Sequence, residues 1–412
     1  MRKRSIVVLA VVWIVVLVAG ISSAVTMSLY GAFDPINTTG SGGRVEVTLE
    51  QYQRIERYER LDEVRKELSD HYYTELDEDA LILGAVRGMA AAADDPYTAY
   101  YTPEEMHKSA VLSQGLYEGV GLLLSGDKAG ELTVLRVFDK SPAHEAGVMA
   151  GDRIIRIGNV AVNAKTQKSR DEAIDMLRHE DDKLVTVTIR RGDEILTIGM
   201  ARSTIQIQRV DYELLPENIG YIALYEFNGN DVEGFKAAVK AFKAAQVKKV
   251  IIDVRSNPGG RLSDVVDICD QLMPEGLIVY TQDRDGRRQN YFSDSSYWDV
   301  EIAVLVNNMS ASASEILAGA LKDTSRALIV GEQTFGKGIV QTLVPLKPDG
   351  AGIQLTTATY VTPGGKSIHG VGIEPDIVVS LGEADSVVLR TGASLDHDQQ
   401  LKTAYEALLK KR

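Results

Sequence analysis

The chain of 412 residues contains a single cysteine, Cys269, which excludes an intrachain disulfide. The apolar residues around it recur at helical spacing, at Val265, Val266, Ile268 and Leu272. This pattern predicts a thiol that is buried as a small apolar group rather than one that acts as a nucleophile.

An excess of basic residues is also missing, because 45 Lys and Arg stand against 58 Asp and Glu and give a formal net charge of −13. Non-specific binding to nucleic acid depends on a basic surface, so the charge argues against such a partner. The sequence shows no cluster of His, Cys and Asp at the spacing of metal ligands. We therefore expect neither a metal nor an organic cofactor.

An apolar run, residues 6–30, follows the basic residues Arg2, Lys3 and Arg4. About 25 residues at about 1.5 Å each form a helix of roughly 38 Å, enough to cross a hydrocarbon core of about 30 Å. The basic residues should stay in the cytoplasm. Residues 1–30 are therefore predicted to be a single-pass signal-anchor in the cell membrane, with the rest of the chain extracytoplasmic.

A cleaved signal peptide is the alternative, because the small residues at 22–24 offer a cleavage site. Cleavage would give a secreted protein, but the length of the apolar run favours the anchor. The glycine-rich residues 31–44 are expected to form a linker.

Residues 45–114 are predicted to form a helical segment. Thr48 and Gln51 have the spacing of a capping box at the start of its first helix. A second helix is predicted over residues 79–93, and residues 94–105 have the composition of a turn-rich connector.

From residue 219 onward, apolar strand patterns alternate with helical patterns, including helices predicted over 231–246 and 262–273. This alternation is typical of an α/β fold whose strands are buried on both faces. It predicts an α/β domain over residues 204–383, followed by a tail, residues 384–412, that contains an amphipathic helix.

Within this domain the apolar run 302–306 leads through Ser310, Ser312 and Ser314 into a helix predicted over 310–323. A strand that enters a helix through small hydroxyl residues places a side chain beside free backbone N–H groups. A nucleophile with an oxyanion hole requires such a place. The plainer interpretation is that these serines only cap the helix.

Lys337 favours the interpretation of Ser312 as a nucleophile. The chain between the two residues is long enough for a helix, a turn and a returning strand, which would bring the lysine beside the serine. A lysine that accepts a serine proton must be neutral. This requires a pKa of roughly 7–8 instead of about 10.4, or about 4 kcal/mol of desolvation. The flanking Gly336 and Gly338 and the apolar residues after them suit such an environment.

The segment SASASE, followed by FGKG and a glutamine, resembles the carboxyl-terminal processing peptidases, which are tail-specific serine proteases with a PDZ domain. By position, the resemblance implies that Ser312 is the nucleophile and Lys337 the general base. It implies that Gln341 orients the lysine.

The same resemblance implies a crotonase-like superhelical β/α catalytic core. It also implies an oxyanion hole formed by the N–H of Ala313 with that of Gly259 or Gly260, and the choice between the two glycines stays open.

Residues 115–203 are similar to a PDZ domain, in which an extended peptide adds to an open strand and its carboxylate enters a nest of N–H groups. The residues implied to bind the tail are Tyr117, Gly119, Val120 and Gly121. Tyr and Val stand where the family more often has Phe and Ile. From the residues alone, the two glycines are equally consistent with a bulge or tight turn.

Together these features predict an α/β multidomain protein: an extracytoplasmic serine endopeptidase that recognises protein C-terminal tails and cleaves them through a Ser–Lys dyad and an acyl-enzyme. The expected partners are proteins or peptides with accessible C-termini and the membrane. Relatives in the family often form dimers through their N-terminal helices, so a homodimer is also expected.

Three alternative functions agree less well with the sequence. A nucleotide-binding P-loop matches from Gly331 to Lys337, but Gly338 replaces the required Ser or Thr and a strand pattern follows. A Ser–His–Asp hydrolase would have to use His369, the one histidine near the serine and lysine in the catalytic half. A non-enzymatic PDZ scaffold on a membrane anchor is disfavoured by the intact serine, lysine and glutamine.

Overall fold

The computed structural model describes residues 47–113, 115–126, 130–138, 140–178, 183–380 and 393–410. The predicted signal-anchor and linker lie outside these residues. Within the described ranges, none of the helices combines the length and the apolar character needed to cross a bilayer. The chain divides into two compact units, Met1–Leu81 and Ile82–Arg412, and each is considered by itself.

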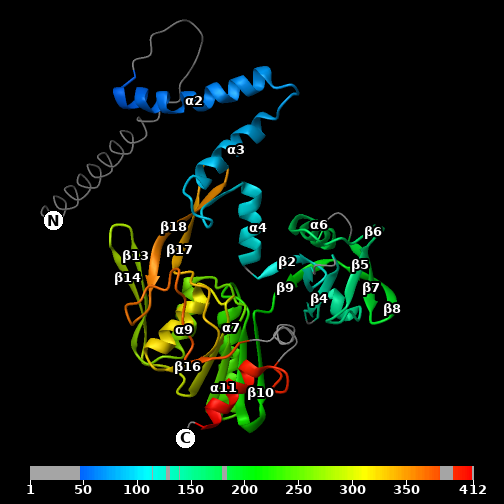
Figure 1. Ribbon diagram of the computed structural model, residues 1–412, viewed down its shortest axis with the longest axis vertical. Coiled ribbons are helices and arrows are strands. Elements are labelled where there is room, and N and C mark those ends of the chain that lie inside the picture. The colour runs from blue at the N-terminus through cyan, green and yellow to red at the C-terminus, as the bar shows by residue number, and fades with distance from the viewer. Residues whose placement is uncertain are drawn as a thin grey trace, which may run out of the picture. The chain divides into compact units, whose positions relative to one another are not determined.

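Helix α2 (Leu49–His71) is the main element in the described part of the first unit (Figure 1). The Gln51 N–H donates to Thr48 Oγ1 over 3.2 Å and the Thr48 N–H donates to Gln51 Oε1 over 2.8 Å, which confirms the capping box. The helix contains no buried residue. Its exposed large apolar residues are Leu49, Tyr52, Ile55, Tyr58, Leu61 and Val64.

Helix α3 (Glu78–Ala91) follows and confirms the second predicted helix, although it ends two residues before the expected boundary. The predicted connector is more ordered than its composition indicated. It contains strand β1 (Ala99–Tyr101) and the start of helix α4 (Pro103–Ser113). The missed signal for α4 was a second capping box, in which the Glu105 N–H donates to Thr102 Oγ1 and the Thr102 N–H donates to Glu105 Oε2.

The region predicted to be a PDZ domain contains a sheet with the order β3-β4-β5-β7-β8, so β3 lies at its edge. Its strands are β3 (Leu122–Gly126), β4 (Leu132–Val137), β5 (Arg153–Ile157), β7 (Leu184–Arg191) and β8 (Glu194–Ala201), with β6 (Val160–Ala161) beside β5 and helices α5 (Pro142–Glu145) and α6 (Gln167–Arg178). The chain enters this region through β2 (Leu116–Gly119) and leaves through β9 (Ser203–Gln206), and these two strands pair antiparallel. Entry and exit therefore lie side by side.

The α/β region is built on a second sheet with the order β10-β11-β12-β15-β16-β19, parallel from β11 onward. Its strands are β10 (Val210–Leu215), β11 (Ile219–Leu224), β12 (Lys249–Asp253), β15 (Glu301–Val306), β16 (Ala327–Gly331) and β19 (Ile377–Val378), and a 3-10 turn, Pro216–Asn218, joins the first two. Helices α7 (Asp231–Ala244), α8 (Leu262–Asp270) and α9 (Ala313–Asp323) contribute to one core cluster of this region, and α11 (Gln399–Lys410) contributes to the other.

Side chains alternate between these two clusters along each central strand. Ile252 and Val304 belong to the cluster with α7, α8 and α9, whereas Ile251 and Ala303 belong to the cluster with α11. Both faces of the parallel strands are therefore covered, which confirms the α/β prediction. Cys269 is fully buried on α8, and burial raises the pKa of its thiol, so it is the inert apolar group that the sequence predicted.

A third sheet, entirely antiparallel, consists of β1, β18 (Gly352–Val361), β13 (Gly276–Asp283) and β14 (Arg288–Ser293), with β17 (Ile339–Pro345) paired to β18. Strand β17 carries the chain away from Lys337, and β18 ends at the buried Tyr360 and Val361. This sheet therefore supplies residues to the site described below.

Two carboxylic acids are buried together where α7 and α8 begin. Asp231 is fully buried, and among the described residues neither of its carboxyl oxygens, nor Oδ2 of Asp264, has a hydrogen-bond partner. Burial, followed by the charge of Asp264, raises the pKa of Asp231 to about 7. The pair therefore holds a proton that the unfolded chain would release near pH 4.

This pair predicts a loss of stability as pH rises. The folded state binds more protons than the unfolded state between about pH 4 and pH 7, so the free energy of unfolding should fall across this window, by at most about 4 kcal/mol. Asp231→Asn should remove this contribution, whereas Asp267→Asn, at an exposed position of α8, should keep it. Urea denaturation at pH 5 and pH 8 measures how much the free energy of unfolding changes with pH in each protein. An equal change in wild type and Asp231→Asn would contradict a proton held by this pair.

Candidate active site

The three serines after β15 occupy different environments. Ser310 and Ser314 are fully buried, and their hydroxyls donate to the carbonyls of Val254 (2.8 Å) and Asn257 (3.0 Å). These two serines join the start of α9 to the neighbouring 254–260 loop. Ser312 alone is partly accessible.

The backbone at Ser312 is strained, with φ 56° and ψ −113°, although it is not a glycine. A conformation of this kind costs on the order of 1–3 kcal/mol and persists only where the surrounding structure enforces it. The strand-to-helix turn thereby exposes the middle serine at the first turn of α9, as a nucleophile elbow does in α/β-hydrolases.

Glu315 connects this turn to the segment that contains Lys337. Its carboxylate is fully buried and accepts four hydrogen bonds. Oε2 accepts the N–H of Ser312 (2.8 Å) and that of Lys337 (2.8 Å). Oε1 accepts the Thr334 hydroxyl (2.5 Å) and the Gly336 N–H (2.7 Å). One side chain therefore fixes the backbones of both residues that the sequence singled out.

The Lys337 side chain is half-buried, and burial lowers its pKa, while the nearby charge of Asp95 acts in the opposite direction. Its Nζ lies 4.2 Å from the centre of the Tyr97 ring. Among the residues that the structure describes, this amine and the Ser312 hydroxyl share no hydrogen bond.

Gln341 lies on β17, and its amide donates to the Thr356 hydroxyl over 3.3 Å rather than to the lysine. Tyr360, which the sequence analysis missed, contacts both the predicted nucleophile and the predicted base. Its hydroxyl donates to the Lys337 carbonyl and also interacts with the side chain of Ser312. Burial, with the charge of Glu315, raises its pKa well above the usual range, so the hydroxyl keeps its proton. No local pattern in β18 distinguishes this tyrosine from a core residue.

The NPGG loop packs directly against the serine. At Gly259 (φ 103°) an added Cβ would lie 2.7 Å from Ser312 Cβ and 2.9 Å from the Ala313 nitrogen, so only glycine fits. The Gly259 N–H donates to Asn257 Oδ1 (2.8 Å). The N–H groups of Gly260 and Ala313 have no acceptor among the described residues.

Two of the alternatives lose support at this site. Lys337 is followed by strand β17 and not by a helix, so no helix N-terminus is available to bind phosphate. His369 is exposed, and it is its backbone that packs against Gly338. In the described part of the chain, no three His, Cys, Asp or Glu side chains are grouped to hold a metal ion.

The PDZ residues border a small cavity of about 120 Å³ beside the edge strand β3. Tyr117, Gly119 and Val120 contribute to its lining, together with Leu122, Leu123, Leu124, Ile174, Leu177 and Arg178. At Gly121 (φ 88°) an added Cβ would overlap Ser141, which explains the glycine without involving a ligand. Burial raises the pKa of Tyr117 to about 12, so this residue is a neutral wall of the cavity.

Three protein-family models match different parts of the chain. The model of peptidase family S41 matches residues 218–379, that of the PDZ domain matches 133–191, and that of the N-terminal domain of the activating protease CtpB matches 25–105. A carboxy-terminal-processing protease of Bartonella bacilliformis is 36% identical over 332 residues, which are 78% of this chain and 74% of that protein. A carboxyl-terminal-processing protease of Picosynechococcus is 36% identical over 303 residues, 72% of each chain.

Two solved structures agree with these matches. The photosystem II D1 C-terminal processing protease is 30% identical, with a TM-score of 0.52 over 86% of this chain and all of that one. A putative S41 protease from Bacteroides fragilis, 16% identical, has a TM-score of 0.60 over 90% of this chain and 99% of that one, and shows the fold alone.

The fold and these matches define a serine-type peptidase that carries a PDZ domain. The chain belongs to the carboxy-terminal-processing proteases of peptidase family S41, which confirms the resemblance seen in the sequence.

Proposed function

We propose that the chain cleaves proteins after recognising their C-terminal tails, with Ser312 and Lys337 as a catalytic dyad. The observation that carries the proposal is that the Glu315 carboxylate accepts the backbone N–H groups of both Ser312 and Lys337. It therefore fixes the strained serine close to the half-buried lysine. Such a serine next to a desolvated amine suits acyl transfer.

In the proposed reaction, neutral Lys337 takes the Ser312 hydroxyl proton while the oxygen forms a bond to the peptide carbonyl carbon. The tetrahedral intermediate loses its amine, which takes the proton from the lysine, and an ester to Ser312 remains. Water then attacks the ester with the same base and releases the new carboxyl end. Gln341 supports the lysine in this proposal through its bond to Thr356.

The oxyanion formed in these steps needs backbone donors. We assign them to Ala313, the first residue of α9, and to Gly260, because the Gly259 N–H is already occupied by Asn257. Gly259 keeps a separate role, since its missing side chain lets the loop approach the serine. Loss of one such donor typically costs about 10²–10³ in turnover.

The substrate tail is proposed to pair with β3, with its last side chain in the cavity beside Tyr117 and its carboxylate at the N–H groups of Gly119, Val120 and Gly121. Tail binding is further proposed to switch on cleavage. Arg136 on β4 supports this proposal, because it donates to Asp211 on β10 over 2.6 Å and so connects the two domains directly. Equal cleavage of free and amidated tails would count against the switch.

The domain boundaries given above, the crotonase-like superhelical core and the single-pass anchor over residues 1–30 remain parts of the same proposal. The apolar sequence of residues 6–30 supports an anchor with the peptidase outside the cytoplasm. The exposed apolar residues of α2 support a homodimer in which a second copy covers them. Protease protection of membrane vesicles and light scattering of the purified protein test these two points.

The central test is incubation of the purified protein with an unstructured substrate that ends in apolar residues, with the products identified by mass spectrometry. Ser312→Ala and Lys337→Ala should each abolish cleavage, whereas His369→Ala should cleave like wild type, because its side chain is exposed. Cleavage by Ser312→Ala equal to wild type would support a scaffold instead, and loss of activity in His369→Ala would support a Ser–His–Asp hydrolase.

A further inference from the structure

The segment that precedes the PDZ domain, residues 94–101, lies against the proposed lysine. Strand β1 pairs with β18, with Ala99 opposite Gln354. The Gln354 side chain also donates to the Tyr97 carbonyl over 2.9 Å. Tyr97 is therefore fixed to the sheet that borders the active site, far along the chain from the catalytic domain in which Lys337 lies.

Asp95 is fixed in the same place. Its carboxylate accepts the hydroxyls of Thr356 (2.6 Å) and Thr98 (2.7 Å) and the Tyr97 N–H (3.0 Å). These bonds, with that of Thr356 foremost, lower the pKa of Asp95 and keep it ionised. The Thr356 hydroxyl also accepts a hydrogen bond from the Gln341 amide. Gln341, which was predicted to orient the lysine, is therefore connected to Asp95 through Thr356.

These two side chains act on the same amine. The face of the Tyr97 ring carries negative potential and attracts the Lys337 ammonium at 4.2 Å. Asp95 adds a negative charge close to it. Both interactions favour the protonated form of the lysine, which is the form that cannot act as a base.

The other groups around Lys337 face its backbone. From α9, the Glu315 carboxylate accepts the Lys337 N–H, and from β18 the neutral Tyr360 hydroxyl donates to its carbonyl. The backbone of His369 packs on the adjacent Gly338, and its imidazole is exposed. Asp95 is thus the charged group that acts on the amine itself, and its charge raises the pKa of Lys337.

We propose that Asp95 and Tyr97 are positioning residues that hold the protonated Lys337 amine over the tyrosine ring, in a resting position from which it must lose its proton and turn toward Ser312. This inference rests on the proposed role of Lys337 as general base. It assigns the segment before the PDZ domain a part in setting the pH at which the peptidase becomes active.

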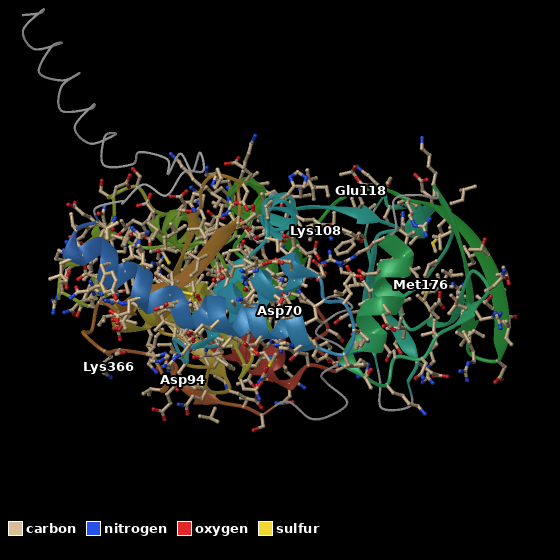
Figure 2. All side chains as sticks on the ribbon, turned by 90° about the horizontal axis from the view of Figure 1, so that it is seen from above. Asp70, Asp94, Lys108, Glu118, Met176 and Lys366 are labelled. Carbon is tan, nitrogen blue, oxygen red and sulfur yellow. The ribbon has the colours of Figure 1, made fainter. Side chains whose placement is uncertain are left out.

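The proposal is tested by the pH dependence of kcat/KM for a tail-bearing peptide, measured from pH 5 to pH 9.5. Asp95→Asn and Tyr97→Leu should each make deprotonation easier, so the acid limb should move down by roughly 0.5–1 pH unit. Tyr97→Phe keeps the ring and should leave the limb in place. Asp94→Asn is the matched control, since Asp94 (labelled in Figure 2) is an exposed neighbour with φ 50° that Asn tolerates.

A lower kcat at every pH with an unmoved acid limb in both Asp95→Asn and Tyr97→Leu would overturn the proposal, because a structural defect alone gives that result. The pH dependence of Lys337 acetylation, followed by mass spectrometry, reports the amine without requiring activity and should shift in the same direction. The two hypotheses fail differently. Full activity of Lys337→Ala would refute the dyad, whereas inactive Lys337→Ala together with unshifted acetylation would refute only the role of Asp95 and Tyr97.

Discussion

Replacement of Glu315 by glutamine is expected to reduce both stability and activity severely. The carboxylate accepts two hydrogen bonds on each oxygen, and an amide nitrogen at either place would face two donors. Two buried donors would lose their acceptor, at about 1–3 kcal/mol each, so the free energy of unfolding should fall by roughly 2–6 kcal/mol. Urea denaturation measures this loss.

The effect of Glu315→Gln on turnover follows from the same contacts. The serine and lysine backbones would no longer share an anchor, and a displacement of about 1 Å at reacting groups can cost about 10² in rate. Glu374→Gln, an exposed carboxylate in the same domain, is the matched control and should resemble wild type in both measurements. A fully active Glu315→Gln enzyme of normal stability would show that this carboxylate does not organise the site.

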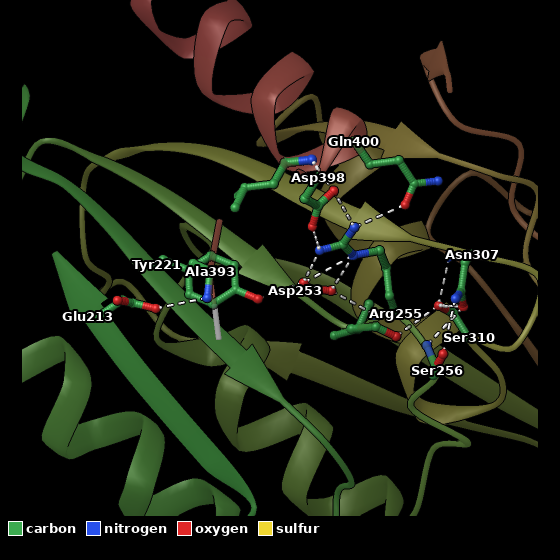
Figure 3. Close-up of polar contacts among 12 residues, drawn as sticks. Glu213, Tyr221, Asp253, Arg255, Ser256, Asn307, Ser310, Ala393, Asp398 and Gln400 are labelled. Carbon is green, nitrogen blue, oxygen red and sulfur yellow. Dashed lines mark hydrogen bonds and ion pairs between the residues drawn. The ribbon is translucent and has the colours of Figure 1, made fainter. Parts of the chain in front are cut away.

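Asp398→Ala is expected to cause a large loss of stability. Arg255 is almost fully buried between Asp253 and Asp398 (Figure 3), and its guanidinium donates to both oxygens of Asp398 over 2.9 and 2.7 Å. Burial alone would lower the pKa of Arg255, but the two carboxylates raise it above its ordinary value, so the side chain stays charged. Removal of one partner of such a buried pair typically costs about 3–5 kcal/mol.

The same substitution should also weaken the packing of α11 against the sheet. Asp398 accepts the Leu401 N–H at the start of that helix, and the neighbouring Gln400 accepts a further bond from Arg255. Asp396→Ala, at an exposed position of the same segment, should leave the urea midpoint unchanged. A midpoint for Asp398→Ala within error of wild type would mean that solvent or another acceptor replaces the carboxylate.

Arg255 also connects helix α11 to the loop that carries the proposed oxyanion hole. It directly precedes Ser256, whose N–H donates to Asn307 Oδ1 over 2.8 Å, and the NPGG residues begin at the next position. Figure 3 shows this continuous set of contacts from α11 through β12 to the loop after β15. We therefore expect Asp398→Ala to lower kcat in addition to stability.

Much of this architecture was predictable because its signals are local. Helix α2 has its capping residues within four positions, and the strands around β15 are short apolar runs. The serine and lysine were identified because their flanking glycines and hydroxyl residues form a recognisable segment. Helix α4 has an equally local signal in its capping residues Thr102 and Glu105.

The contacts that organise the site were not predictable in the same way. Thr356 and Asp95 are 261 positions apart, and Arg255 and Asp398 are 143 positions apart. Periodicity tells which face of a strand or helix is apolar, but it does not tell which distant segment covers that face. Tyr97, Tyr360 and Asp398 therefore look like ordinary connector, strand and tail residues until the three sheets are assembled.

The pairing of β2 with β9 has a consequence for how such an enzyme can change. Because the chain enters and leaves the PDZ domain through neighbouring strands, both covalent connections of the domain to the rest of the chain lie side by side. A domain with adjoining ends can be exchanged for another of similar geometry without altering the order of strands in its host. This peptidase scaffold could acquire new targets by replacing its recognition module while its chemistry stays the same.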